Sequence, residues 1–136
     1  MLYIRTFLGS CYSWHALVGW RLWLWGLMIK YYRLNDNNEV EECDMFQAEE
    51  FLRSPRKIIK QENVDNHWVS TVMLSIDHNF VNDNGSDPIL FETMTKTDGE
   101  WDGYEARYRT YQEALAGHNT IVSKLKKGLP LNDIED

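Results

Sequence analysis

The longest run of alternating hydrophobic side chains lies near the middle of the chain, from Trp68 to Ile76. A β-strand directs successive side chains to opposite faces, so this run presents two sets of residues. The sets are Trp68, Val72, Leu74 and Ile76 on one face, and Val69, Thr71, Met73 and Ser75 on the other. Neither set carries a charge, which is typical of a central strand covered on both sides. The pattern therefore predicts the middle strand of a sheet.

Shorter β-like runs precede and follow this strand. The predicted strands span residues 29–34, 39–43, 57–64, 89–96 and 104–109. Turn-forming residues separate them, and these are Asn35 to Asn38, Asp65-Asn66, Asn79 to Pro88, and a flexible turn from Thr97 to Gly103. Because each connection between strands is explicable as a hairpin, we predict an antiparallel sheet.

Two amphipathic helices complete the pattern. The first follows a capping box that begins at Asp44 and ends before Pro55, because the residue before a proline is pushed out of the helical region. The second follows a capping box that begins at Thr110 and is stopped by Gly128. Their apolar stripes are Met45, Ala48, Phe51 and Leu52, and Tyr111, Ala114, Leu115, His118, Ile121, Val122 and Leu125.

These elements predict an α+β fold, in which an antiparallel sheet of about four to six strands carries two amphipathic helices packed on one face. A chain of 136 residues is long enough for one domain with its own hydrophobic core. We place this single domain at residues 28–130 and a short acidic tail at 131–136.

Residues 1–27 differ in composition from the rest of the chain. They are apolar and hold four of the six tryptophans, but His15 and Arg21 interrupt the hydrophobic run. Three interpretations follow, and we rank first an extension that arises because translation truly starts at Met28. A membrane anchor ranks second, since the length suits a bilayer but a buried cation opposes it. An integral element of the core ranks third.

Charge is distributed unevenly along the chain, which has a formal net charge of −7. Residues 1–27 contain two arginines and no acid, so residues 28–136 hold all 21 acidic residues against 12 of the 14 basic ones. An acidic surface argues against binding to a nucleic-acid polymer, which needs clustered Lys and Arg. It still permits a small anionic ligand held by local arginines. Cys11 and Cys43 have no metal-site spacing and are expected to be free thiols in a reducing compartment.

One candidate site lies at the carboxyl end of the central strand, where Asp77, His78, Asn79 and Phe80 lead into a polar loop. An Asp beside a His suggests a base or a metal ligand, but adjacent strand residues face opposite ways and cannot form a simple dyad. The structural alternative, which we favour, is that Asp77 anchors the loop by accepting hydrogen bonds from nearby backbone amides.

Glu92 is a lone carboxylate in an apolar strand, and Arg107 and Arg109 on the next strand are its predicted partners. The pair is either a cross-strand ion pair or an arginine that clamps a ligand, with a slight preference for the ion pair. Aromatic residues, namely Trp68, Phe80, Trp101, Tyr104 and Tyr108, could be exposed at the same end of the sheet. The predicted ligand-binding residues are therefore Asp77, His78, Asn79, Phe80, Glu92, Arg107, Tyr108 and Arg109.

His118 falls on the apolar stripe of the last helix, and we interpret it as a core histidine with satisfied hydrogen bonds. A metal site would need Asp77, His78, Glu92 and His118 to converge, and no metal-ligand spacing supports this. The sequence predicts no catalytic residue, metal or cofactor.

Three segments resemble a family of small, uncharacterised tailed-phage and prophage proteins. They are Val69 to Phe80, with the pattern VSTVxLxxDHxF, Pro88 to Met94, with PxLFETM, and Arg107 to His118, with RYxTxxEAxxGH. The segments occur in the family's order, and the match covers about the last four-fifths of the chain. Val81 to Asp87 departs from the family's Gly-rich pattern by being longer and more acidic.

The resemblance implies a phage origin and a location in the host cytoplasm, with membrane anchoring as the alternative if residues 1–27 are retained. It implies no established activity. The leading hypothesis is a non-enzymatic accessory protein that binds a small anionic ligand or a host protein, by analogy with phage proteins that sequester nucleotide signals. The alternatives are a small metal-dependent hydrolase and a virion or assembly protein, and a homo-oligomer is compatible with each.

Overall fold

The computed structural model describes residues 29–77 and 87–131. The chain divides into two compact units, Met1–Lys30 and Tyr31–Asp136, and the following description concerns the second. Our interpretations of residues 1–27, of His78, Asn79 and Phe80, and of the tail beyond Leu131 lie outside the described residues. Cys43 is a free thiol, as expected, whereas Cys11 is not described.

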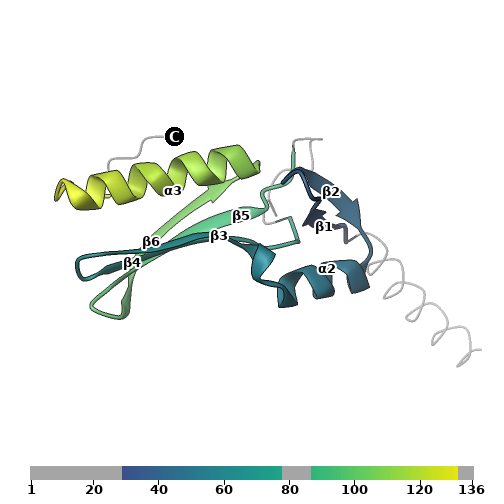
Figure 1. Ribbon diagram of the computed structural model, residues 1–136, viewed down its shortest axis with the longest axis horizontal. Helices are drawn as coiled ribbons and strands as arrows, with labels where there is room; N and C mark the ends of the chain where they lie inside the picture. Colours follow the sequence, from purple (N-terminus) through teal and green to yellow (C-terminus); the bar gives the residue numbers. More distant parts are fainter. Residues whose placement is uncertain (1–28, 78–86, 132–136) are drawn as a thin grey trace, which may run out of the picture. The chain divides into compact units, whose positions relative to one another are not determined.

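The described residues of the second unit form two antiparallel sheets and two longer helices (Figure 1). In chain order the elements are β1 (Tyr31–Leu34), β2 (Val40–Cys43), α2 (Met45–Arg53), the 3₁₀ turn η1 (Pro55–Lys57), β3 (Ile58–Val64), β4 (His67–Met73), β5 (Phe91–Thr97), β6 (Glu100–Tyr108) and α3 (Tyr111–Lys126). β1 pairs with β2, and the larger sheet has the order β3-β4-β5-β6. The predicted α+β class and the central position of β4 are confirmed.

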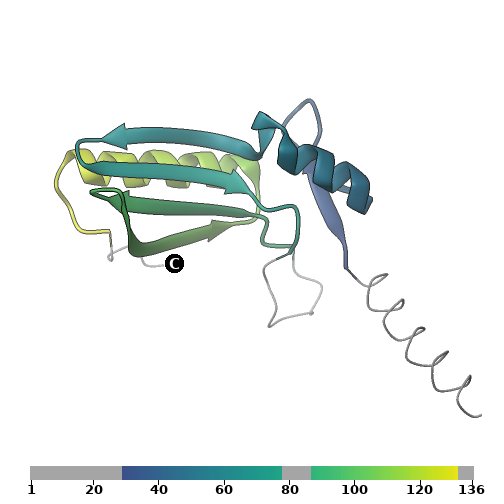
Figure 2. The same ribbon diagram turned by 90° about the horizontal axis from the view of Figure 1, so that it is seen from below.

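α3 lies along one face of the four-stranded sheet and contacts all four strands (Figures 1 and 2). Its buried residues follow the predicted stripe and are Ala114, His118, Ile121, Val122 and Leu125. Its capping box at Thr110 and its end before Gly128, which has a φ of 66°, also match the prediction. Gly117 lies where α3 crosses Tyr108, and a Cβ atom there would overlap the Tyr108 ring.

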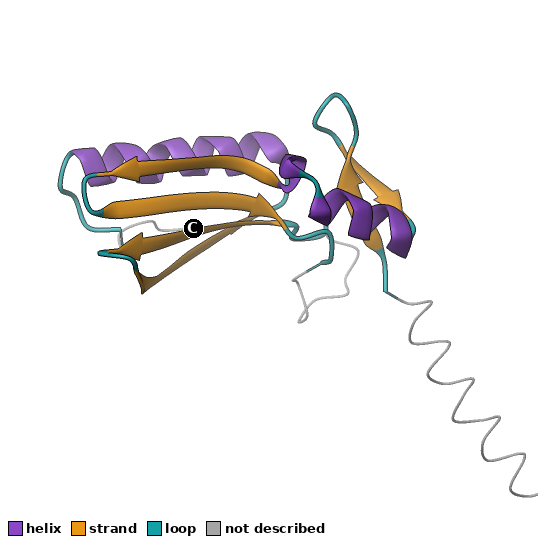
Figure 3. Ribbon diagram, turned by 60° about the horizontal axis from the view of Figure 1, so that its bottom comes forward, coloured by secondary structure: helices purple, strands orange, loops and turns teal. Residues whose placement is uncertain are grey.

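α2 has a different position from the one predicted. It packs against β1 and η1 rather than beside α3 on the large sheet (Figure 3). Its capping box at Asp44 is present, and Ala48 and Phe51 are buried, but Met45 is 52% exposed. No helix in the described part of the chain packs on the face of β4 opposite α3. The prediction that helices or strands cover both faces of this uncharged strand is therefore not met by the described residues.

Most buried apolar side chains of the described residues form two clusters. One gathers Leu34, Phe51, Met73, Leu90, Phe91 and Ala114, and joins the β1–β2–α2 segment to one end of the large sheet. The other gathers Val64, Val69, Ile121, Val122 and Leu125 under the remainder of α3. Neither described helix is long and apolar enough to cross a lipid bilayer.

Two predicted boundaries were wrong. The flexible turn at 97–103 is only Asp98-Gly99, both with positive φ, and β6 starts at Glu100. Gly103, with a φ of 83°, marks an irregularity in the β5–β6 register rather than a second turn. β4 ends at Met73 because the chain then turns through Ser75, with a φ of 60°, and bridges to β1 through Ile76.

Candidate functional site

Asp77 is the one described residue of the predicted Asp77-to-Phe80 loop site. Its Oδ1 atom accepts a hydrogen bond of 2.8 Å from the backbone amide of Ile89, on the far side of the connection between β4 and β5. The carboxylate therefore anchors the two ends of this connection, as the structural alternative predicted.

Glu92 and Arg107 occupy paired positions on β5 and β6 and form the predicted cross-strand ion pair, with 3.5 Å between Oε2 and Nε. Arg107 also contacts Glu105, with 2.5 Å between Nη2 and Oε1. Burial raises the pKa of Glu92, and hydrogen bonding to Glu105 and the charge of Glu105 add to this, while Arg107 opposes it. Arg107 therefore already serves two carboxylates, which disfavours the reading of it as a ligand clamp.

Tyr108 and Arg109 do not extend this surface. Tyr108 faces α3, since it pairs with the buried Phe91 and its ring lies against Gly117. Burial raises its pKa above the usual value for tyrosine. Arg109 is half-buried, and its backbone amide donates to Glu113 in the α3 capping box. The predicted site residues thus share one end of the sheet but divide between its two faces.

The predicted aromatic surface was wrong. Tyr104 packs into the cluster under α3, and burial raises its pKa to about 12. Trp68 and Trp101 lie at the opposite end of the sheet from Arg107, on either side of Lys96 in the strand register. The Lys96 ammonium is 5.1 Å from the centre of the Trp68 ring, within the range of a cation–π contact.

His118 is a core histidine, as predicted. It is fully buried, with Nδ1 2.8 Å from the Thr71 hydroxyl and Nε2 3.2 Å from Glu62. Burial lowers its pKa, while Glu62 acts in the opposite direction. The order hydroxyl–imidazole–carboxylate matches that of a nucleophilic triad, but Thr71 is fully buried and also bonds Thr93 at 2.5 Å. No substrate could reach that hydroxyl, so the network is structural.

The predicted hydrolase residues do not converge within the described chain. Glu92 lies on the face of the sheet opposite α3, whereas His118 belongs to α3 and contacts Thr71 on the face that α3 covers. Among the residues that the structure describes, no group of three or more His, Cys, Asp or Glu side chains could hold a metal ion. His78 lies outside those residues.

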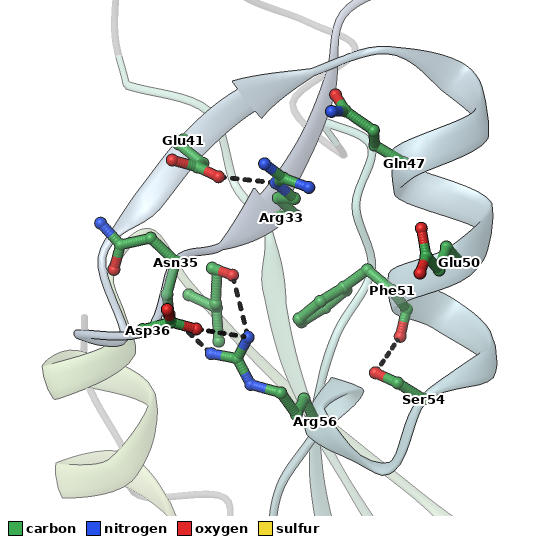
Figure 4. Close-up of a pocket in the computed structure, with 10 residues that line it drawn as sticks. Arg33, Asn35, Asp36, Glu41, Gln47, Glu50, Phe51, Ser54 and Arg56 are labelled. Carbon is green, nitrogen blue, oxygen red and sulfur yellow. Dashed lines mark hydrogen bonds and ion pairs between the residues drawn. The ribbon is translucent and has the colours of Figure 1, made fainter.

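A concave site occurs instead between the β1–β2 hairpin, α2 and η1 (Figure 4). We call it the hairpin pocket, and its volume is about 500 Å³. That volume lies within the usual range for small-molecule sites, roughly 300–1,000 Å³. The pocket is lined by Arg33, Leu34, Asn35, Asp36, Glu41, Gln47, Glu50, Phe51, Ser54 and Arg56.

Two guanidinium groups enter the hairpin pocket. Arg33 lies between Glu41 and the side chains of α2 (Figure 4), and its Nε donates to Glu41 at 2.6 Å. This contact raises the already high pKa of Arg33. Arg56 reaches back from η1, with Nη2 donating to the carbonyl of Asn35 at 2.6 Å and Nη1 to that of Leu34 at 3.4 Å. Arg56 therefore holds the wall of the pocket in place.

The sequence interpretation missed this pocket because it depends on hairpin register. A four-residue turn at 35–38 would pair Arg33 with Val40, whereas the structure pairs Arg33 with Glu41. The Asn35 side chain accepts bonds from the amides of Asn37 and Glu39, which lengthens the loop by one residue. The available signal was the asparagine at the start of the turn, together with Asn38, which adopts a φ of 60°.

No protein-family model, curated protein or solved structure matches this chain. A functional assignment must therefore rest on the geometry of its own residues. The hairpin pocket combines a ligand-sized volume with two arginine side chains that line it.

Proposed function

We propose that this protein is a non-enzymatic accessory protein of phage origin that binds a small anionic, nucleotide-like ligand in the hairpin pocket. The observation that carries the proposal is the Arg33 side chain. Glu41 bonds its Nε atom, and within the described chain the two terminal nitrogens contact no acceptor. Paired guanidinium nitrogens bind the two oxygens of a phosphate or carboxylate in bidentate fashion, which makes Arg33 the anion-binding group.

Carboxylates in the same pocket favour a ligand with a second, hydrogen-bond-donating end. Glu50 is exposed and contacts no partner in the described residues, and Asp36 is fully exposed, 3.8 Å from Arg56. A carboxylate accepts hydrogen bonds from the amino and ring N–H groups of a nucleobase. A nucleotide presents such donors at one end and phosphate at the other, whereas inorganic phosphate satisfies Arg33 alone.

The pocket is preorganised, which favours binding. Arg56 bonds two backbone carbonyls of the hairpin and lies 6.0 Å from the centre of the Phe51 ring, so the hairpin, α2 and η1 are tied together without a ligand. A ligand that enters a fixed pocket loses less conformational entropy on binding than one that must order the wall.

Sequestration without turnover agrees with the resemblance to small phage proteins, because a protein that counters a host nucleotide signal needs affinity rather than chemistry. The proposal moves the ligand site away from Asp77, Glu92 and Arg107. Asp77 and Arg107 are engaged with other groups of the fold. The two terminal nitrogens of Arg33, in contrast, contact no acceptor among the described residues.

The test is a thermal-shift and calorimetry series on the full chain with nucleoside mono-, di- and triphosphates, cyclic nucleotides, a nucleoside and inorganic phosphate. A ligand that binds only the folded state raises the melting temperature. We expect a shift with at least one nucleotide, a smaller shift with phosphate and none with the nucleoside. Arg33→Met should weaken nucleotide binding by about tenfold or more, since it removes a charge-assisted bidentate contact.

Arg53→Met is the matched control. Arg53 also lies on this segment and pairs with a carboxylate, but its side chain is 79% exposed and it does not line the pocket. Glu50→Gln should weaken nucleotide binding while leaving phosphate binding unchanged. Equal affinity of Arg33→Met and wild type, or no response to any nucleotide, would refute the proposal.

A further inference from the structure

The face of the β3–β6 sheet opposite α3, which we call the open face, carries side chains in three rows across the four strands. The strand register places Asn63, Trp68, Lys96 and Trp101 in the first row, Gln61, Ser70, Met94 and Glu105 in the second, and Ile58, Val72, Glu92 and Arg107 in the third. Figure 2 shows the four strands from this side, with α3 behind them.

Large apolar and aromatic side chains are exposed on the open face. Trp101 is 61% exposed and Ile58 36%, while Trp68, Val72 and Met94 are half-buried. Tryptophan, methionine and arginine are among the residues enriched at protein interfaces. The open face therefore carries several residues of the kind that form the centres of interfaces, together with charged residues that need partners.

We infer that two copies of this chain associate through their open faces, about a twofold axis that runs across the strands along the second row. Such an axis sets each strand over the same strand of the second copy and exchanges the first and third rows. An interface of this kind is isologous, so every contact between unlike residues occurs twice.

The exchange of rows sets charged residues of one copy opposite favourable partners on the other. Lys96 of one copy meets Glu92 of the other, and Trp101 meets Arg107. The first pair is a salt bridge and the second a cation–π contact, so Lys96 and Arg107 each keep a favourable partner when the interface closes, and the pairing fixes the register of the two copies. Trp68 meets Val72 in the same arrangement, so the apolar residues face one another as well. Met94 of one copy packs against Met94 of the other, near the twofold axis.

An axis parallel to the strands matches charge less well. It sets β4 over β5 and leaves Glu92 opposite Val72 and Arg107 opposite Ile58, so two charges face apolar side chains. That axis also sets Lys96 opposite Trp68 and gives it no carboxylate partner. Because burying a charge without an opposite charge is costly, we choose the axis across the strands, which sets Lys96 opposite Glu92. In this arrangement Glu105 of one copy lies near Glu105 of the other, at the outer strand. Each is already paired within its own chain with Arg107, at 2.5 Å.

The size of the surface sets the expected affinity. Four strands about 4.8 Å apart and rows about 7 Å apart give a patch of roughly 20 by 20 Å with its side chains. Two such patches bury on the order of 1,000 Å² in total, near the lower limit for a specific interface. We therefore expect a dimer with a dissociation constant in the micromolar range.

The test is sedimentation equilibrium of the full chain, whose monomer mass is 16.1 kDa, over a range of micromolar concentrations. The wild type should approach twice this mass. Lys96→Glu places two like-charge pairs in the interface, and Glu92→Lys does the same with the opposite sign. Each variant alone should dimerise at least about 100-fold more weakly, because like charges across an interface cost several kcal/mol.

An equimolar mixture of the two variants provides the decisive arm. In the mixed dimer both charge pairs are complementary again, so the mixture should recover the dimer mass although neither component forms it alone. Lys126→Glu is the matched control, since Lys126 is exposed on α3 and the same change there should leave dimerisation intact. Trp101→Ala, at an exposed position, should also weaken the dimer.

A monomeric wild type, or a dimer that Lys96→Glu and Trp101→Ala leave unchanged, would overturn the inference. Failure of the mixture to associate, with both variants folded by circular dichroism, would reject the proposed axis. If Glu92→Lys does not fold, the two exposed variants still decide the result. None of these outcomes depends on the hairpin pocket.

Discussion

Each face of the large sheet carries some residues that hydrophobicity alone would assign to the other face. On the inner face, under α3, Thr71, Thr93 and Thr95 are fully buried beside apolar residues, and so is His118 of α3, which contacts Thr71. On the open face, Trp101 is 61% exposed. The comparison teaches that the covering helix, rather than the alternation of side chains, decides which face becomes the core.

The inner face can bury polar side chains because they bond one another. Thr71 contacts both Thr93 and His118, and the Thr95 hydroxyl donates to the Asp102 carboxylate at 2.5 and 2.6 Å. A buried polar group without a partner costs about 1–3 kcal/mol, so this network must be nearly complete for the fold to be stable. The open face needs no such network, since water reaches its side chains.

The largest predicted contrast comes from one substitution made on each face. Met73 on β4 is 1% exposed beneath α3, whereas Met94 on β5 is half-buried on the open face. Met73→Ala should reduce the free energy of unfolding by about 2–5 kcal/mol, because it removes buried contacts and leaves a cavity. Met94→Ala should reduce it by less than about 1 kcal/mol. Urea denaturation at low protein concentration measures both, and equal losses would remove the distinction between the faces.

A second prediction concerns the tight approach of α3 to the inner face. Gly117→Ala places a methyl group in the Tyr108 ring, so it should destabilise the protein by about 1–3 kcal/mol through overpacking. In a Tyr108→Ala background the same change should instead stabilise by about 0.5–1 kcal/mol, because alanine is the better helix former and the obstacle is gone.

This reversal of sign is the critical readout of the Gly117 series, and thermal denaturation of the four proteins in the cycle measures it. A Gly117→Ala change that stabilises the protein with Tyr108 present would mean that α3 lies farther from the sheet than described.

The smallest predicted effect is a pH dependence that belongs to the inner face alone. Burial lowers the pKa of His118 below its ordinary value of 6.5, so the unfolded state takes up a proton first as the pH falls. The stabilisation is therefore complete above pH 6.5 and is lost as the pH falls below it, towards the lowered pKa of the folded state. The slope for one proton cannot exceed about 1.4 kcal/mol per pH unit.

Urea titrations between about pH 7.5 and about pH 5.5 measure this slope in the wild type and in His118→Gln. The variant should be less stable at neutral pH, but its free energy of unfolding should no longer show the decrease below pH 6.5 that His118 causes. Glu62, whose pKa is lowered chiefly by Lys60, acts at lower pH, since its stabilisation is lost only below its ordinary value of 4.5. An unchanged slope in His118→Gln would assign the dependence to other groups.

The sequence by itself determined the local elements of this protein. The capping boxes at Asp44 and Thr110, the stripe of α3 and the two-residue turn at Asp65-Asn66 follow from interactions between residues close in the chain, so a single sequence reveals them. It also identified β4 as the central strand, because its alternate residues lack charge on both faces. The pairing of Glu92 with Arg107 was also predictable, because the two residues lie on consecutive strands that form a hairpin.

Only the tertiary structure decided which face of the sheet α3 covers and where the two tryptophans of the open face lie. Both faces of β4 are uncharged, so nothing local distinguishes them, and the choice depends on the packing of α3 some 40 residues later. The hairpin pocket was hidden for a related reason. A one-residue change in register moves a side chain to the other face of a strand. Asn35 sets that register by accepting bonds from the amides of Asn37 and Glu39, which the alternation of residues along the strands does not predict.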